Sequence, residues 1–381
     1  MFKHLARILL GLTFIFSGFV KGIDPWGSTY KFTDYFNAFH LPWLTGLAFA
    51  LGILLAATEF FMGVALIFNF FTRIISWLVL VFMVFFTGLT LILALTNPVT
   101  DCGCFGDALV ITNWQTFYKN IVLLALAVYI FYQRKNFRSK NGPVLSIALT
   151  VMTMTVYFYL VTYSYNHLPI IDFSAYKVGV NIPDAMKIPD NAPKAVYKNK
   201  FIYQNRKTGE NKEFTEENYP WKDSLNWKFV KMEDPILLQK GYTPPIHDFR
   251  IETPEGEDVK DFFLYDDQYT VIVVAYNLQK ANRAGMMKIA ALANECVGKK
   301  FKFILLTSTS PDSFSAFKNE TGVTFDFFNT DEITLKTMIR SDPGLIILKK
   351  GTIVRKYHFN DIPSRKDLES QLDQGPHSTV E

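Results

Sequence analysis

Cysteine is scarce in this chain, which has three cysteines among its 381 residues. Two of them, Cys102 and Cys104, are separated by a single residue, whereas Cys296 is far away in the sequence. A structural zinc site takes four ligands, so two neighbouring thiols are too few to build one. We therefore expect no metal site, and the Cys102/Cys104 pair is the place to look for thiol chemistry.

The chain also lacks long runs of charge of one sign, and it lacks internal repeats. Positive and negative residues alternate after the first half, and the formal net charge is only +4. Binding of nucleic acid usually requires a continuous basic patch. The sequence therefore gives no indication of nucleic acid as a partner.

Apolar residues, in contrast, are dense up to about Leu168 and ordinary after it. Five apolar stretches approach or reach the length of roughly 18–25 residues that a helix needs to cross a bilayer. Soluble helical cores seldom have five such runs in succession, so we predict an integral membrane bundle in contact with lipid. The stretches are Ile8–Val20 (extended at its ends by Leu5 and Gly22), Leu44–Phe70, Ile74–Leu95, Thr116–Tyr132 and Val144–Tyr165.

Basic residues are distributed unevenly between the two ends of these stretches. The loop with the two cysteines contains Asp101 and Asp107 but no basic residue before Lys119. Because cytoplasmic loops are enriched in lysine and arginine, we expect a cytoplasmic N-terminus and an extracytoplasmic, periplasmic position for the cysteine loop and for everything after about His167. The basic residues of the opposite side are Lys3, Arg7, Arg73, Arg134, Lys135, Arg138 and Lys140. The first stretch is not followed by an Ala-x-Ala cleavage pattern, so we interpret it as a retained span of the cytoplasmic (inner) membrane.

The cysteine pair lies in the short polar loop Asp101–Asp107, between the third and fourth stretches. A disulfide between Cys102 and Cys104 would close a very small ring, which cannot easily reach relaxed geometry and should be more reducible than a structural disulfide. Outside the cytoplasm such a pair can persist in the oxidised form. We favour a working redox pair, and a static disulfide or two incidental thiols are the alternatives.

Two ionisable residues lie within the apolar stretches or at their edge. Glu59 is near the middle of the second stretch, where a lone carboxyl is costly unless it is neutral or paired, so it should face the bundle interior. It could be a proton carrier or a hydrogen-bond partner of a quinone. The alternative is a staple between helices, bonded to a hydroxyl such as Thr87 or Thr90. Lys21 ends the first stretch, and there we expect a structural anchor that extends outward to the interface.

Two residue patterns predict helices that pack closely or lie at the interface. Gly52, Ala56 and Gly63 form a stripe of small residues near Glu59, which favours close approach of a second helix. In the first loop, aromatic residues recur at helical spacing and indicate a short amphipathic helix. These aromatic residues are Phe32, Tyr35, Phe36 and Phe39.

The second half of the chain has a different pattern. Residues 169–244 are of mixed composition and interrupted by prolines, with a hairpin predicted over Lys200–Thr215. From about Pro245, short apolar strands alternate with helices. The expected strands are Tyr269–Tyr276, Lys302–Thr307, Phe325–Phe328, Gly344–Leu348 and Thr352–Tyr357, and the expected helices are Ala284–Val297, Ser313–Glu320 and Ile333–Arg340.

Three segments of the first half resemble the DoxX/MauE family of four-helix membrane proteins. They are Leu10–Pro25, Glu59–Gly63 and the Cys-Gly-Cys-Phe-Gly element in Asp101–Asp107. The family is associated with periplasmic redox chemistry and is similar in architecture to vitamin K epoxide reductase-like and DsbB-type disulfide-forming proteins. The resemblance covers about residues 1–135. It implies that Cys102 and Cys104 are the redox pair and that Glu59 is the membrane acid.

The C-terminal pattern resembles thioredoxin-like domains of the TlpA/MauD type. The run Asp342-Pro343-Gly-Leu-Ile-Ile-Leu-Lys-Lys-Gly is similar to their cis-proline strand and hairpin, which implies that Pro343 is the cis proline; the alternative is an ordinary proline at the start of a strand. The Cys-x-x-Cys of that fold would follow the first central strand, but residues 276–285 contain no cysteine. Cys296 is expected to be a small buried residue. The domain should therefore bind a partner or cover the cysteine loop instead of exchanging disulfides.

These observations predict a multi-domain protein: an α-helical transmembrane bundle followed by an exported α/β thioredoxin-like domain. We expect a four-helix membrane domain at 1–135, a fifth transmembrane helix within 136–168, an exported linker and hairpin at 169–244, and the thioredoxin-like domain at 245–375. Two functions fit. The first is a thiol–disulfide oxidoreductase that passes electrons to a quinone or to an envelope protein. The second is a non-enzymatic scaffold that recruits envelope proteins.

The charge asymmetry generates a prediction about topology. Labelling of single introduced cysteines should place residues 134–140 on the cytoplasmic side, and should place the Cys102 loop and the residues after His167 outside. External protease should then remove the C-terminal domain from intact spheroplasts. Complete resistance of the chain to external protease, with the same protease active on lysed cells, would contradict this orientation.

Overall fold

A computed structural model describes residues 2–99, 101–137, 142–239 and 241–374. The chain forms two compact units. The first unit combines Met1–Asn181 with Phe249–Glu381, and the second consists of Ile182–Asp248. The first unit therefore contains both the apolar helices and an α/β domain.

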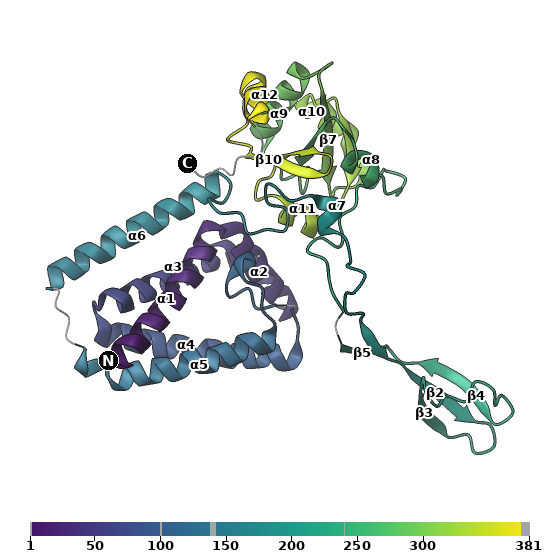
Figure 1. The fold of residues 1–381 in the computed structure, drawn as a ribbon, viewed down its shortest axis with the longest axis horizontal. Helices are drawn as coiled ribbons and strands as arrows, with labels where there is room; N and C mark the ends of the chain where they lie inside the picture. Colours follow the sequence, from purple (N-terminus) through teal and green to yellow (C-terminus); the bar gives the residue numbers. More distant parts are fainter. Residues whose placement is uncertain (1, 100, 138–141, 240, 375–381) are drawn as a thin grey trace. The chain divides into compact units, whose positions relative to one another are not determined.

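Within the described residues, five helical segments are long and apolar enough to cross a membrane, which confirms the five predicted stretches and a multi-pass membrane protein. The first of them is longer than its apolar run suggested and begins at Phe2. The segments are α1 (Phe2–Ile23), η1 (Pro42–Leu47) continuing into α3 (Ala48–Phe68), α4 (Thr72–Thr96), α5 (Asn113–Tyr132) and α6 (Pro143–Asn166) (Figure 1).

Local sequence explains where these helices begin and end. Asn69 and Asn97 follow α3 and α4 in the left-handed conformation, which asparagine tolerates better than most residues. Thr112 and Gln115 form a reciprocal capping box at the start of α5. Pro143 occupies the first position of α6, where its missing N–H costs no hydrogen bond.

Helices α1 and α3 approach each other closely because glycines face each other across the contact. A Cβ atom on Gly63 would lie 2.7 Å from the carbonyl oxygen of Gly11 and 2.6 Å from the amide nitrogen of Ile15. On α1, a Cβ atom on Gly18 would lie 2.6 Å from the carbonyl oxygen of Ala56. Ala56 and Gly63 of the expected stripe therefore pack against α1, and neither Gly18 nor Gly63 tolerates a side chain there. Gly52, the third residue of the stripe, faces Ser28 of α2 instead.

Polar contacts connect the remaining helices. Asn120 of α5 donates to the hydroxyl of Thr90 on α4 at 3.2 Å. Tyr157 of α6 stacks on Phe60 of α3 and donates to the carbonyl of Gly18 at 3.2 Å. The aromatic spacing in the first loop corresponds to helix α2 (Pro25–Ala38), which confirms a helix there. Short helices η2 (Gly106–Ala108) and η3 (Arg134–Asn136) lie on either side of α5 in the chain.

The α/β domain is built on a five-stranded sheet of order β10-β9-β6-β7-β8. Strands β6, β7 and β8 are parallel, and β9 and β10 form an antiparallel hairpin beside β6. Helix α9 makes the crossover from β6 to β7, and α9, α10 and α12 pack on one face of the sheet (Figure 1). The strands are β6 (Tyr269–Val274), β7 (Phe301–Thr307), β8 (Asp326–Asn329), β9 (Gly344–Lys349) and β10 (Thr352–His358). The helices are α8 (Lys260–Leu264), α9 (Arg283–Glu295), η4 (Pro311–Ser313), α10 (Phe314–Thr321), α11 (Glu332–Met338) and α12 (Arg365–Asp373).

All the strands and helices expected after Pro245 are present, with ends within about two residues of their predicted bounds. The strand order and the helical connections, α9 between β6 and β7 and α10 between β7 and β8, are those of a thioredoxin-like domain, so the predicted fold class is confirmed. The peptide bond between Asp342 and Pro343, just before β9, is cis.

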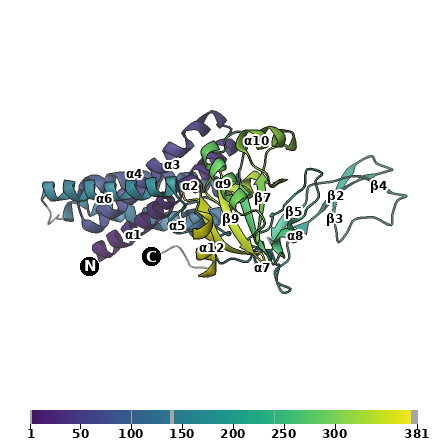
Figure 2. The same cartoon turned by 90° about the horizontal axis from the view of Figure 1, so that it is seen from above.

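The second unit contains the predicted hairpin. Strands β2 (Lys200–Asn205) and β3 (Asn211–Thr215) pair antiparallel, and β4 (Trp227–Met232) adds to the other edge of β2 (Figures 1 and 2). Edge-to-face aromatic contacts of Tyr203 support this small sheet. A short helix, α7 (Ile182–Ala185), and a strand pair, β1 (Val196–Lys198) with β5 (Ile236–Gln239), complete the unit.

The close approach of α1 and α3 can be tested with one methyl group. Gly63→Ala should lower the free energy of unfolding by about 1–3 kcal/mol, because its Cβ atom meets backbone atoms that cannot move independently. Gly88→Ala on α4 is the matched control, since no atom outside its own helix lies within 4 Å of a Cβ atom there. Thermal unfolding in detergent micelles measures both. Equal melting temperatures for the two variants would contradict the described packing.

Candidate functional site

The two loop cysteines lie side by side between α4 and α5. Their Sγ atoms are 2.9 Å apart, and both residues are free thiols. Gly103 between them has φ +62°, which glycine adopts without strain. Its amide donates to the carboxylate of Asp101 at 2.9 Å, and its carbonyl accepts from the amide of Gly106 at 3.1 Å. This tight turn places Cys102 and Cys104 where they can share a hydrogen bond or form a disulfide.

Side chains of α1 and α2 hold the loop backbone. The Tyr35 hydroxyl donates to the carbonyl of Cys102 at 2.6 Å, and the Ser17 hydroxyl lies 2.8 Å from the carbonyl of Cys104. Lys31 forms a 2.7 Å ion pair with the aspartate that precedes the thiols. Most of these contacts are made to peptide groups and to a flanking acid, so they position the loop through its backbone, and the Tyr35 hydroxyl also hydrogen-bonds to the Cys102 thiol.

A buried ion pair lies next to the loop, between α1 and α3. The ammonium of Lys21 is 2.7 and 3.0 Å from the two carboxylate oxygens of Glu59. Ser17 joins this pair, with its hydroxyl 2.8 Å from Glu59 Oε2 and 2.8 Å from Lys21 Nζ. Each of the three residues is at most 8% exposed. Because the Ser17 hydroxyl reaches both Glu59 and the carbonyl of Cys104, it links the ion pair to the thiol loop.

The structure corrects two expectations about this cluster. Lys21 does not extend outward as an interface anchor but turns inward onto Glu59. The partners of Glu59 are Ser17 and Lys21 of α1, and not the hydroxyls of Thr87 or Thr90 on α4. The reason is electrostatic, since a cation stabilises a buried carboxylate more strongly than a hydroxyl does. Lys21 and Ser17 are four residues apart, so both lie on the same face of α1.

The surroundings of Cys102 and Cys104 shift the pKa values of the two thiols in opposite directions. A hydrogen bond from Cys102 lowers the pKa of Cys104, and the nearby charges of Lys119 and Lys21 add to this effect, against the opposing effect of burial. The same hydrogen bond, together with burial, raises the pKa of Cys102. The Lys119 ammonium lies 4.3 Å from the centre of the Phe105 ring, which holds it close to the loop. Of the two thiols, Cys104 therefore ionises more readily and is the better leaving group.

A small cavity with aromatic walls opens beside Cys104 within the helical bundle. Its volume is about 40 Å³. Glu59 and Ser17 lie at one side, and Lys119 and Asn120 of α5 at another. Rings and apolar side chains complete the lining: Phe14, Phe82, Met83, Phe86, Phe105 and Leu123, together with Thr13. The cavity thus combines apolar walls with a few polar groups and one thiol, which is the lining of a small-molecule site, but its volume is far below the roughly 300–1,000 Å³ of such sites.

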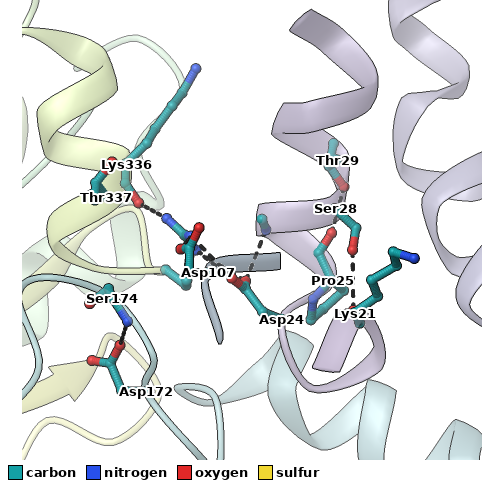
Figure 3. A network of polar contacts seen from close by, with 12 residues as sticks. Lys21, Asp24, Pro25, Ser28, Thr29, Asp107, Asp172, Ser174, Lys336 and Thr337 are labelled. Atoms are coloured by element: carbon teal, nitrogen blue, oxygen red, sulfur yellow. Dashed lines mark hydrogen bonds and ion pairs between the residues drawn. The ribbon is translucent and has the colours of Figure 1, made fainter. Parts of the chain in front are cut away.

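An arginine of the α/β domain also reaches this region. The Arg340 guanidinium is 3.0 Å from the carboxylate of Asp24, which precedes α2, and 2.8 Å from that of Asp107, three residues after Cys104. Figure 3 shows Asp24 and Asp107 meeting beside the helix that carries Lys336 and Thr337. Arg340 is not among the site residues predicted from the sequence. The only sequence signal was its position two residues before Asp342-Pro343.

The α/β domain itself brings no thiol to the site. The start of α9, where a Cys-x-x-Cys would be expected, has Asn282 at its N-cap, and the Asn282 amide donates to the carbonyl of Asp342. Cys296 follows the last turn of α9 and is 1% exposed in the core, as expected. Burial also raises the pKa of Asp342 to about 7. Among the described residues, no group of three or more His, Cys, Asp or Glu side chains could hold a metal ion.

Fold and site together define a membrane-embedded helical bundle with a paired-thiol loop, joined to a thioredoxin-like domain. Residues 1–133 match the family model described as methylamine utilisation protein MauE. Residues 197–239 match a domain of unknown function, DUF8463. Over 170 residues the chain is 28% identical to protein TlpB of Flavobacterium psychrophilum; the match covers 41% of this chain and 44% of TlpB. The aligned region thus spans less than half of that relative's length.

Solved structures similar to this chain include two bacterial proteins. A secreted disulfide oxidoreductase of Mycobacterium tuberculosis is 12% identical, with 33% of this chain and 96% of that protein covered and a TM-score of 0.25. StoA of Bacillus subtilis is 14% identical, with 32% and 95% covered and a TM-score of 0.25. The fold assignment rests on the strand order and connections described above.

The buried ion pair generates a prediction about stability. Glu59→Leu should destabilise the protein by about 3–5 kcal/mol, because it leaves the Lys21 charge buried without its partner. Glu59→Gln should cost less, since the amide oxygen can still accept from Lys21. The double variant Lys21→Met, Glu59→Leu should recover most of the loss. Unfolding in detergent measures this cycle, and additive losses in the double variant would contradict a direct pair.

Proposed function

We propose that this protein is a thiol–disulfide oxidoreductase of the cytoplasmic membrane that acts on the periplasmic face through Cys102 and Cys104. The observation that carries the proposal is the 2.9 Å approach of the two sulfur atoms in a loop whose backbone is anchored by Ser17 and Tyr35. The lowered pKa of Cys104 supports it, because thiol exchange proceeds through the thiolate. The match of residues 1–133 to MauE supports a bundle of the DoxX and vitamin K epoxide reductase type.

In the oxidised form, the Cys102–Cys104 disulfide would accept electrons from a dithiol of an envelope protein. A partner thiolate attacks Cys102 Sγ and forms a mixed disulfide, and Cys104 leaves as the thiolate because its pKa is the lower one. The second partner thiolate then attacks the partner's own sulfur and releases Cys102. The partner loses two electrons and two protons and gains a disulfide, and the loop becomes a dithiol.

The reduced pair must pass two electrons and two protons to an acceptor, and we propose a quinone of the bilayer, which becomes a quinol by taking them up. The cavity beside Cys104 supports this choice by its lining, because aromatic side chains suit a flat apolar ring system. At about 40 Å³ it holds only a few waters, so these side chains must move apart when a quinone binds. Lys119 and Asn120 supply N–H donors for a quinone carbonyl. Glu59, in contact with Ser17 and Lys21, is the proposed proton carrier for the departing thiol protons.

A second candidate is a non-enzymatic scaffold whose thioredoxin-like domain recruits envelope proteins. The absence of cysteine at the start of α9 favours it, because this domain cannot relay electrons by itself. In that case the Cys-Gly-Cys loop is structural, and the protein works without redox change at Cys102 and Cys104. The two candidates therefore differ in what happens when both thiols are removed.

Reconstitution of the purified protein in liposomes with a ubiquinone or menaquinone analogue and a dithiol tests the proposal. Quinol should form with the wild type, and Cys102→Ser and Cys104→Ser should each abolish it while the protein remains inserted and folded. Cys296→Ala is the matched control and should retain the full rate, because that thiol is buried in the α/β core. Unchanged quinol formation in the double Ser variant would refute the oxidoreductase and leave the scaffold.

A further inference from the structure

The face of the α/β domain that carries Arg340 lies directly against the thiol loop. Arg340 follows α11 and is only 9% exposed. Its guanidinium spans two carboxylates from separate elements of the membrane part, Asp24 before α2 and Asp107 in the loop itself. One side chain of the α/β domain therefore connects the thiol loop to the start of α2.

The surroundings of Arg340 fit this double contact closely. Its guanidinium also donates to the carbonyl of Lys336, and it lies 5.5 Å from the centre of the Tyr30 ring of α2. Gly27 leaves the space for the contact, because a Cβ atom there would be 2.3 Å from the Asp24 carboxylate and 3.2 Å from the guanidinium. The membrane part thus provides a binding position that fits the Arg340 guanidinium.

Further ion pairs hold the domain to the segment that follows α6. Lys356 of β10 forms a 2.6 Å pair with Asp172, and only 6% of the lysine side chain is exposed. His167 is 2.7 Å from the carboxylate of Asp361. These contacts are charged and polar, as are those of Arg340. Polar contacts between domains resemble those of transient interfaces, which open and close.

The space enclosed between the domain and the loop is small. A cavity of about 40 Å³ is lined by Gly103, Gly106 and Asp107 of the loop and by Arg340 and Lys356 of the domain. At about 10–15 Å³ for each water molecule, it holds roughly three waters. A peptide that carries a thiol is much larger. With the domain docked, this side of the loop admits water and excludes a protein partner, whereas Cys102 and Cys104 themselves stay partly exposed, so a small reagent can still reach them.

We propose that the thioredoxin-like domain is a removable cap over the thiol loop, latched by Arg340 to Asp24 and Asp107, and that a protein thiol reaches Cys102 and Cys104 only after the latch opens. The proposal rests on the proposed function for the role of the thiol pair. It gives this domain, which has no cysteine at the start of α9, the role of controlling access to the thiols. Opening breaks the two carboxylate contacts of Arg340 and exchanges them for water.

Thiol labelling with reagents of two sizes tests the cap. Membranes are reduced with a phosphine and then treated with N-ethylmaleimide or with a 5 kDa polyethylene glycol maleimide. Arg340→Gln should accelerate labelling of Cys102 and Cys104 by the large reagent about tenfold, because it shifts the protein toward the open form. Labelling by the small reagent should change by less than about twofold, since it enters the closed form as well.

The chain offers two internal controls. Arg283→Gln removes an arginine–glutamate pair of the same domain, at Glu320, and should leave both rates unchanged. Cys296 reports unfolding, because this core thiol reacts only if the domain opens up. If Cys296 becomes labelled in Arg340→Gln, Asp24→Asn replaces it as the test variant, since it weakens the latch from the membrane side.

Equal rates for the large reagent in wild type and in a variant with an intact Cys296 would overturn the cap. A faster rate in Arg340→Gln and in Arg283→Gln alike would also overturn it, because the effect would not depend on the latch. The labelling rate of reduced thiols does not require electron transfer. If Arg340→Gln accelerates labelling as predicted but the wild-type protein forms no quinol, the proposed function is refuted and the cap is not.

Discussion

The ion pair between Lys21 and Glu59 is the interaction on which the rest of the membrane part depends. A carboxylate in an apolar bundle needs a partner, and here the partner comes from the neighbouring helix. The pair forms because Gly18 and Gly63 allow the backbones of α1 and α3 to approach closely. Ser17 then extends the cluster to the carbonyl of Cys104. A packing feature of two helices thereby fixes the position of the thiol loop.

The thiol loop also depends on contacts from outside the membrane bundle. Its backbone is held by α1 and α2 on one side, and Asp107 is held by Arg340 on the other. The loop is thus positioned by the bundle and contacted at Asp107 by the α/β domain. This arrangement accounts for a thioredoxin-like domain without cysteines at the start of α9. The domain acts on the thiol loop through the charge and the shape of the face that contacts Asp24 and Asp107.

Much of this fold could be predicted from the sequence, because run length and periodicity are local properties. The five membrane helices and the strands of the α/β sheet follow from them, and the spacing of Cys102 and Cys104 identified the thiol loop. The partner of Glu59 could not be predicted, since it depends on which face of α1 meets α3. Arg340 could not be predicted either. It contacts Asp24, which is 316 positions away in the sequence, and no local sequence pattern specifies where a domain docks.

The central claim is that Cys102 and Cys104 cycle between dithiol and disulfide in the membrane. The most direct measurement is their redox state in native membranes, trapped by acid and differential alkylation and read by mass spectrometry, with respiration active and with quinol oxidation blocked. We expect a disulfide under active respiration and a growing dithiol fraction after the block, with Cys296 reduced throughout. Two thiols that stay reduced in respiring cells, or a disulfide that ignores the block, would contradict it.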